Sequence, residues 1–245
     1  MAFGANQLGI LIKNNLIMEN YHDKKFPNEC NEYRLARNEL LHAEINLRRQ
    51  TEEVAALRRK LPYSAKVEED YVFEEKDASG KIKQTKISEL FKPGKDSLII
   101  YSFMFGPKNE KPCTNCTSIL DGLNGMIFHA EQRVNVAVVA KTSIKKLTEW
   151  AENRRWGNLH LLSSAGNTYN IDYYGEDEKG NQWPILNVFK KMGNEVYHVY
   201  ATELLFLKSE PGQNSRHVDA IWPLWSLFDY TPDGRGSDWY PKHSY

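Results

Sequence analysis

The stretch that decides the fold reads Ser97-Leu-Ile-Ile-Tyr-Ser-Phe-Met-Phe-Gly-Pro107 and is soon followed by Cys113-Thr-Asn-Cys116. Its apolar residues predict a buried central strand over 97–104, and the Gly-Pro pair predicts a loop after that strand. The pattern behind the cysteines predicts a helix over about 116–133. The sequence therefore places two cysteines between a buried strand and the start of a helix.

This placement suits dithiol chemistry. The free N–H groups and the positive dipole end of a helix stabilise a thiolate, which is the nucleophilic form of cysteine. We therefore predict that Cys113 is the attacking thiolate and that Cys116 resolves the mixed disulfide. The expected substrate is a protein or a small-molecule thiol or disulfide. No bound cofactor is required, because electrons would come from another thiol system.

Upstream of this region, a heptad pattern predicts a long helix. Tyr33, Leu40, Leu47, Val54 and Leu61 recur every seven residues, followed three residues later by Ala36, Ala43, Gln50 and Leu57. This seam predicts an amphipathic helical arm over 28–62, which Pro62 ends. Two interpretations stay open: the arm pairs with a second copy as a homodimer, or it packs on its own domain. Residues 1–27 are expected to form a poorly ordered leader.

Residues 63–245 alternate between predicted strands and helices. The predicted elements are a hairpin from 71–73 and 82–87 around the turn 77–80, strands over 134–140 and 159–164, a Ser143-capped helix over 143–156, a hairpin from 183–190 and 195–202 at the end of the sheet, and a helix near 221–228. Strands that alternate with helices predict an α/β domain with right-handed crossovers and parallel strands.

Composition narrows the function classes. The 245 residues include 32 basic and 32 acidic side chains, so the formal charge is zero, which argues against nucleic acid as a partner. No stretch approaches the roughly 18 continuous apolar residues of a membrane span, so no membrane partner is expected. Three cysteines, with Cys30 isolated, do not form a disulfide framework. A reducing, cytoplasmic location is therefore predicted.

Several motifs carry a family resemblance. They are Leu57-Arg-Arg-Lys-Leu-Pro62, the stretch 101–107, Cys113-Thr-Asn-Cys116 with Asp121-Gly-Leu-Asn-Gly125, and the stretches 163–172, 196–202 and 229–236. With them, residues 30–245 resemble a bacterial family of uncharacterised thioredoxin-like proteins, a domain of unknown function related to thioredoxins and peroxiredoxins. The resemblance implies an α/β fold with a thioredoxin-like central mixed sheet flanked by helices. It implies little about activity.

Two departures from the relatives of this family are visible. Thioredoxins usually place a cis-proline before the strand that faces the active site, and the stretch matched to it, 158–163, has none. Peroxiredoxins carry Pro-x-x-x-Thr-x-x-Cys, but Glu110 stands where the threonine should be. Peroxidase chemistry by that mechanism is therefore not expected, although Leu161-Leu-Ser-Ser-Ala-Gly166 resembles a peroxiredoxin strand and turn.

Other interpretations of the two cysteines remain open at this point. With His129 they match three ligands of a zinc finger, and Cys30, His160 or His198 would have to supply the fourth. Alternatively, the thiols are inert and the protein is a non-enzymatic thioredoxin-like interaction module.

Other residues have further candidate roles. His160 could be a proton shuttle, and Tyr101 and Phe103 could line the thiol pocket. Turn or cap roles are expected for Asp121, Asp172 and Asp229, and a sealed core or interface is expected at Trp222, Trp225 and Trp239.

Overall fold

The computed structural model describes residues 21–245, so most of the predicted leader lies outside the described residues. The chain divides into two units, Met1–Leu61 and Pro62–Tyr245. The first unit contains the helix α1 (Asn31–Arg59), which is 29 residues long. Cys30 is its N-cap, and the N–H of Tyr33 donates a hydrogen bond to the Cys30 sulfur at 3.5 Å. The isolated cysteine thus satisfies one of the free N–H groups at the helix start.

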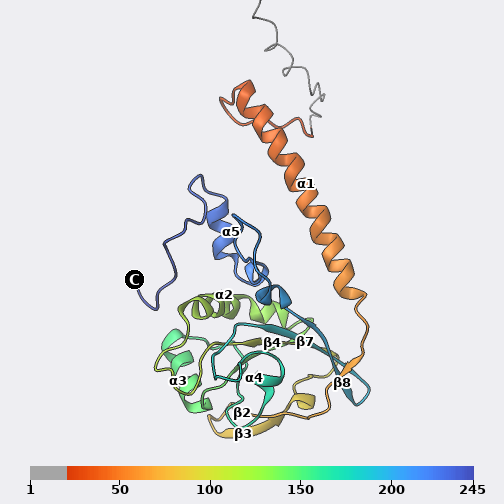
Figure 1. Ribbon diagram of the computed structural model, residues 1–245, viewed down its shortest axis with the longest axis vertical. Coiled ribbons are helices and arrows are strands. Elements are labelled where there is room, and N and C mark those ends of the chain that lie inside the picture. Colours follow the sequence, from red (N-terminus) through yellow and green to blue (C-terminus); the bar gives the residue numbers. More distant parts are fainter. Residues whose placement is uncertain (1–20) are drawn as a thin grey trace, which may run out of the picture. The chain divides into compact units, whose positions relative to one another are not determined.

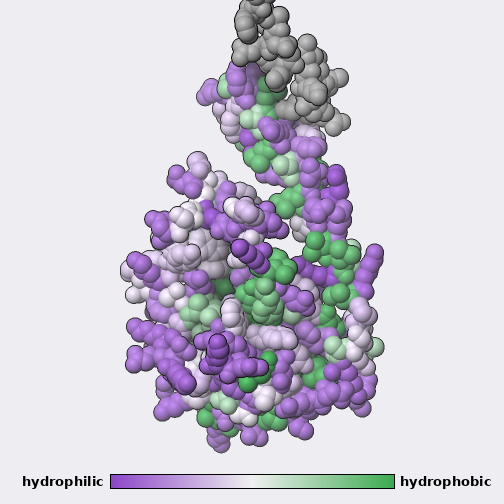
Figure 2. Space-filling model, in the orientation of Figure 1, coloured by the Kyte–Doolittle hydropathy of each residue, from purple (hydrophilic) through white to green (hydrophobic). Residues whose placement is uncertain are grey.

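The seam positions of α1 are exposed. Leu40 is 45% exposed, Leu47 67% and Val54 41%. Apolar surface is visible along this helix in Figure 2. The apolar residues of the seam thus lie on the surface of the first unit.

The second unit is built on one mixed sheet of eight strands in the order β1-β8-β7-β4-β5-β6-β2-β3 (Figure 1). The strands are β1 (Ala65–Lys66), β2 (Val72–Lys76), β3 (Ile82–Lys86), β4 (Ser97–Ser102), β5 (Asn135–Ala140), β6 (Leu161–Ser163), β7 (Leu186–Met192) and β8 (Glu195–Ala201). The helices of this unit are η1 (Ile87–Glu89), α2 (Thr114–Ala130), α3 (Ile144–Arg154), α4 (Tyr169–Asp172), η2 (Glu203–Phe206), η3 (Asp219–Ile221) and α5 (Pro223–Asp229).

β4 is a central strand, as predicted, although it ends at Ser102 rather than at residue 104. It is parallel to β5 on one side and antiparallel to β7 on the other. The hairpin of β7 and β8 is antiparallel and lies toward one end of the sheet, as expected, with only the two-residue strand β1 outside it. On its other side β7 pairs with β4, and Asn187 and Phe189 of β7 are buried.

Alternate residues of the central strands enter two cores. Tyr101, Val136 and Val138 face one core with residues of α2 and α3, whereas Leu98 and Ile100 face the other with Tyr169 of α4. Both crossover helices lie on one face, because the strand order β4-β5-β6 advances in one direction and such crossovers are right-handed. The site-bearing helix α2 therefore packs on a continuous apolar layer.

Local signals in the sequence explain most of these elements. Ser143 caps α3 by accepting a hydrogen bond from the N–H of Lys146 at 3.4 Å. The β2–β3 turn contains Gly80 at φ +80°, a left-handed conformation that glycine adopts without strain. The short elements β1 and α4 were not predicted. Within residues 21–245, no helix combines the length and the apolar character needed to cross a bilayer.

Candidate functional site

The loop after β4 delivers Cys113 to the start of α2. The N–H of Cys113 donates a hydrogen bond to the carbonyl oxygen of Met104 at 3.1 Å, which ties the cysteine to the end of the strand. Cys113 is the N-cap of α2, with extended backbone at φ −60° and ψ 132°. The helix begins at Thr114, two residues before the predicted start, so Cys113 precedes the first turn and Cys116 lies within it.

The pKa of Cys113 is lowered to about 6. The largest cause is a hydrogen bond from the Cys116 thiol, which outweighs the opposing effect of partial burial. The backbone N–H groups of Cys116 and Asn115 lower the pKa further. Because these groups belong to the first turn of α2, the helix start itself holds the thiolate.

Cys116 has the opposite environment. It is 1% exposed, and burial raises its pKa well above the ordinary value, with the hydrogen bond to Cys113 and the charge of Cys113 acting in the same direction. Cys116 is therefore a protonated donor at neutral pH, while Cys113 is an ionised acceptor. Both cysteines are free thiols in this structure.

Tyr101 closes the buried side of the pair. It is fully buried in β4, and its pKa is raised first by burial and then by the nearby Cys116. Its hydroxyl makes no regular hydrogen bond with the described residues. The prediction that Tyr101 adjoins the thiols agrees with this arrangement, whereas Phe103 packs in the core against Phe105 and Trp156.

Residues 214–245, here called the C-terminal segment, lie against the start of α2. Trp222 donates an indole hydrogen bond to Ser118 of α2 at 3.0 Å. Farther along, His243 contacts the backbone of Pro112, its ring lies 4.9 Å from the Trp150 ring, and its carbonyl accepts a hydrogen bond from Arg154 at 2.7 Å. The segment thus reaches the residues on both sides of Cys113. Apart from the many aromatic residues of this segment, no pattern in the sequence indicated that it covers the start of α2.

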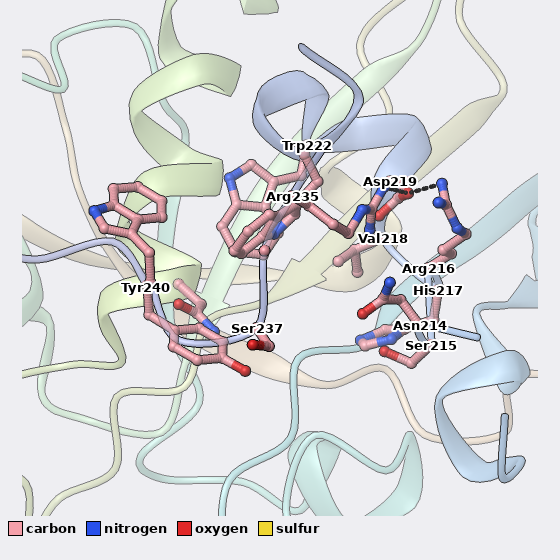
Figure 3. A pocket seen from close by; sticks show the side chains of 14 residues that line it. Asn214, Ser215, Arg216, His217, Val218, Asp219, Trp222, Arg235, Ser237 and Tyr240 are labelled. Carbon is pink, nitrogen blue, oxygen red and sulfur yellow. Dashed lines mark hydrogen bonds and ion pairs between the residues drawn. The ribbon is translucent and has the colours of Figure 1, made fainter. Parts of the chain in front are cut away.

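The C-terminal segment also encloses a cavity of about 320 Å³, drawn in Figure 3. Asn115, which stands between the two cysteines, is part of its lining. Trp222 is buried against the core, as expected for a sealing residue, while Trp239 is 38% exposed. The hollow therefore reaches α2 at Asn115, and neither cysteine is part of its lining.

The structure separates the histidine candidates from the dithiol. His160 bonds through Nε2 to Glu75 of β2, three strands away from β4 in the sheet order, so its proposed role as a proton shuttle finds no support. His129 is exposed near the end of α2. Across residues 21–245, no three His, Cys, Asp or Glu side chains are arranged to hold a metal ion.

The three aspartates make tertiary bonds rather than the expected turns and caps. Asp121 accepts a hydrogen bond from the Trp156 indole at 2.8 Å and pairs with Arg154. Asp172 accepts one from the Tyr71 hydroxyl at 2.8 Å. Asp229 pairs with Arg216 and Arg235. Trp156 and Tyr71 are 35 and 101 residues from their aspartates, so local turn patterns could not indicate these two partners. Arg235 is only six residues from Asp229.

The choice of residues 158–163 as the strand facing the active site is wrong. That stretch contains β6, which borders β5, whereas the antiparallel neighbour of β4 is β7. Pro184 precedes β7, and the carbonyl of Ile185 accepts a hydrogen bond from the N–H of Ser102 at 2.8 Å. A proline thus lies beside the end of β4, and every peptide bond among residues 21–245 is trans.

Peroxiredoxins are among the solved structures that are similar to this chain. The mitochondrial 2-Cys peroxiredoxin from Plasmodium falciparum has 15% identity and a TM-score of 0.43, covering 69% of this chain and 95% of its own. Peroxidoxin BcpB from Mycobacterium tuberculosis has 16% identity and a TM-score of 0.41, covering 65% and 95%. AhpC from Enterococcus faecalis has 14% identity and a TM-score of 0.41, covering 64% and 87%. Among curated proteins none matches the chain.

A family model covers nearly all of the described chain. It matches residues 23–245, which include α1, the sheet, both cysteines and the C-terminal segment. This match confirms the family resemblance inferred from the motifs. The chain belongs to the family described as bacterial protein of unknown function, DUF899.

Proposed function

We propose that the protein is a thiol–disulfide oxidoreductase or thiol-dependent reductase that uses the Cys113–Cys116 dithiol. One observation carries the proposal: the two thiols differ in burial and in protonation state. Cys113 is partly exposed with a pKa of about 6, and Cys116 is buried with a raised pKa. A dithiol reductase needs this difference, because one thiolate must attack while the other thiol waits protonated.

The reaction transfers two electrons from the dithiol to a disulfide. The Cys113 thiolate attacks one substrate sulfur, the substrate S–S bond breaks, and the departing thiolate takes up a proton. Cys116 then loses its proton and attacks the Cys113 sulfur, which releases the second substrate half as a thiol and forms the Cys113–Cys116 disulfide. An external thiol or dithiol reduces this disulfide again, which fits the proposed reducing, cytoplasmic location.

The pH dependence of alkylation tests the proposal. In a Cys30→Ser background, the rate of Cys113 alkylation by iodoacetamide is expected to rise with pH around a midpoint near 6, because only the thiolate reacts. Serine at position 30 removes the exposed thiol and still caps α1. The rate at each pH is measured by mass spectrometry of the labelled peptide.

A matched variant identifies the cause of the low pKa. Cys116→Ala removes the largest stabilising contact of the thiolate, so its alkylation midpoint should move upward. A midpoint near the free value of about 8.5 in the parent protein would contradict the proposal. Thiols that resist alkylation in the folded state would instead favour the interaction-module alternative with inert cysteines.

We also propose that α1 pairs with the same helix of a second copy. Its exposed leucines carry this proposal, since each buried leucine contributes about 1.5–3 kcal/mol. The heptad spacing of Tyr33, Leu40, Leu47 and Val54 suits a left-handed helix pair. The alanines and the glutamine at the intervening seam positions limit the stability of that pair.

The dimer can be tested by adding charge to the seam. Leu40→Asp together with Leu47→Asp is expected to convert a dimer to a monomer in sedimentation velocity, because paired helices would bury unpaired carboxylates. Arg48→Asp together with Arg49→Asp adds acidic side chains off the seam and should leave the dimer intact. A parent protein that sediments as a monomer at high concentration would contradict the pairing.

A further inference from the structure

The C-terminal segment forms nearly the whole wall of the cavity that Asn115 also lines. Its volume is about 320 Å³, and apart from Asn115 its lining comes from residues 214–240. Figure 3 shows Tyr240 and Ser237 on one side, with Asn214, Ser215 and His217 facing them across the hollow. This volume is at the lower end of the range for small-molecule sites and too small for a folded partner.

Asn115 links the cavity to the reacting sulfur. Its backbone N–H is one of the groups that stabilise the Cys113 thiolate, while its side chain lines the cavity. The side-chain oxygen Oδ1 is buried and has no hydrogen-bond partner among the described residues. A molecule in the cavity would contact Asn115, which follows the nucleophile by two residues in the first turn of α2.

The charges around the cavity cancel. Arg216 pairs with Asp219 at 3.2 Å and with Asp229 at 3.0 Å, and Arg235 pairs with Asp219 at 2.9 Å and also with Asp229. Two guanidinium groups thus face two carboxylates, which leaves no net positive charge to attract an anion. A phosphate or a polycarboxylate would have to break this network.

The remaining walls combine aromatic rings with a neutral imidazole. Trp225 and Trp239 pack edge to face with centroids 6.0 Å apart, and both line the cavity with Tyr240. Burial lowers the pKa of His217, so its ring is neutral at pH 7, and Nδ1 is buried with no partner in residues 21–245. The cavity therefore offers flat aromatic surface, and its charged lining residues are already paired.

We infer that this cavity binds one half of a low-molecular-weight, uncharged disulfide that carries a planar ring. The inference rests on the proposed function, because the bound half must present its sulfur to Cys113. Cys113 attacks that sulfur, the other half leaves as a thiol, and Cys116 then releases the bound half as a second thiol. The two electrons come from the protein dithiol, which becomes a disulfide.

Tryptophan substitutions test the cavity separately from the dithiol. In the Cys30→Ser background, reduction of 4,4′-dithiodipyridine, an uncharged aromatic disulfide, is followed by the absorbance of the released thiopyridone. Trp239→Leu removes a 38% exposed cavity indole and should lower the second-order rate constant about tenfold. The matched control Trp183→Leu removes a 40% exposed indole outside the cavity and should leave the rate constant unchanged.

Two further probes define the selectivity. Hydroxyethyl disulfide is uncharged but lacks a ring, and oxidised glutathione is anionic, so Trp239→Leu should change neither rate constant appreciably. The iodoacetamide rate should also stay constant, because that reagent needs only the thiolate. Equal losses for all three disulfides, or no loss for any, would overturn the inference.

A binding measurement keeps the inference independent of turnover. In a Cys30→Ser, Cys113→Ser variant, 4,4′-dithiodipyridine should quench tryptophan fluorescence with a saturating dependence on concentration, and Trp239→Leu should weaken that saturation. Quenching could saturate even if Cys113 of the parent protein shows no alkylation midpoint near 6. That result would support ligand binding in the cavity and reject the dithiol mechanism. Linear quenching with concentration would reject the cavity, whatever the thiols do.

Discussion

Replacing Cys113 by serine, in a Cys30→Ser background, is expected to lower disulfide reductase activity by a factor on the order of 10³ or more. A serine hydroxyl stays protonated at neutral pH, whereas the Cys113 thiol has a pKa of about 6 and is mostly thiolate at pH 7. The measurement is the reduction rate of a small disulfide with an excess of external thiol. The substitution should leave the helix start intact, because serine is a favourable N-cap residue.

Cys116→Ser is the matched partner of that variant. Attack by Cys113 should still occur, but no thiol resolves the product, so a mixed disulfide between Cys113 and the substrate should accumulate. Intact-mass spectrometry would detect this adduct in Cys116→Ser and not in Cys113→Ser. If the double variant Cys113→Ser, Cys116→Ser keeps the parent activity, the two cysteines do not carry the function.

Glu75→Ala is expected to lower the free energy of unfolding by about 3 kcal/mol. The carboxylate of Glu75 is buried in β2 and bonds to His160, to Thr85 and, at 2.8 Å, to Lys83. Removal of the carboxylate leaves these groups without their common partner. Urea unfolding measures the loss, and Glu152→Ala is the control, since Glu152 is 71% exposed and pairs with Lys76 at 3.4 Å. The control should change stability by less than about 1 kcal/mol.

The same carboxylate makes stability depend on pH. Burial alone would raise the pKa of Glu75, but the hydrogen bonds from His160, Lys83 and Thr85 lower it to about 2, against an ordinary value of 4.5. Its contribution is therefore present above pH 4.5 and is lost as pH falls toward 2, by about 3 kcal/mol. Glu75→Gln should flatten this part of the profile. An unchanged profile in that variant would show that other groups control acid unfolding.

The region around Cys113 could be predicted because its signals are contiguous. The apolar run, Gly106-Pro107 and the cysteine spacing act over one strand, one loop and one helix, and the structure assembles them in that order. The helix cap at Ser143 and the turn at Gly80 could be predicted equally well, because a cap and a left-handed turn depend only on neighbouring residues. Errors at these elements are limited to shifts of a few residues at their ends.

Long-range pairing could not be predicted from periodicity. Glu75 and His160 stand 85 residues apart, and nothing local to either residue indicates the other. The order of the strands could not be predicted for the same reason. The local sequence pattern of the Leu186–Ala201 hairpin would be the same in the middle of a sheet and at its edge. The cover over the dithiol depends on bonds such as Trp222 to Ser118, 104 residues apart.

The contacts of the C-terminal segment with the start of α2 can form only late in protein synthesis. The ribosome completes β4, α2 and the rest of the sheet before it reaches residues 214–245, which need about 2–6 s more at ordinary elongation rates. During that interval Pro112 and Asn115 lack these neighbours. A chain interrupted between residues 202 and 214 would therefore also lack Val218 and Trp222, which are buried in the same core as Cys116.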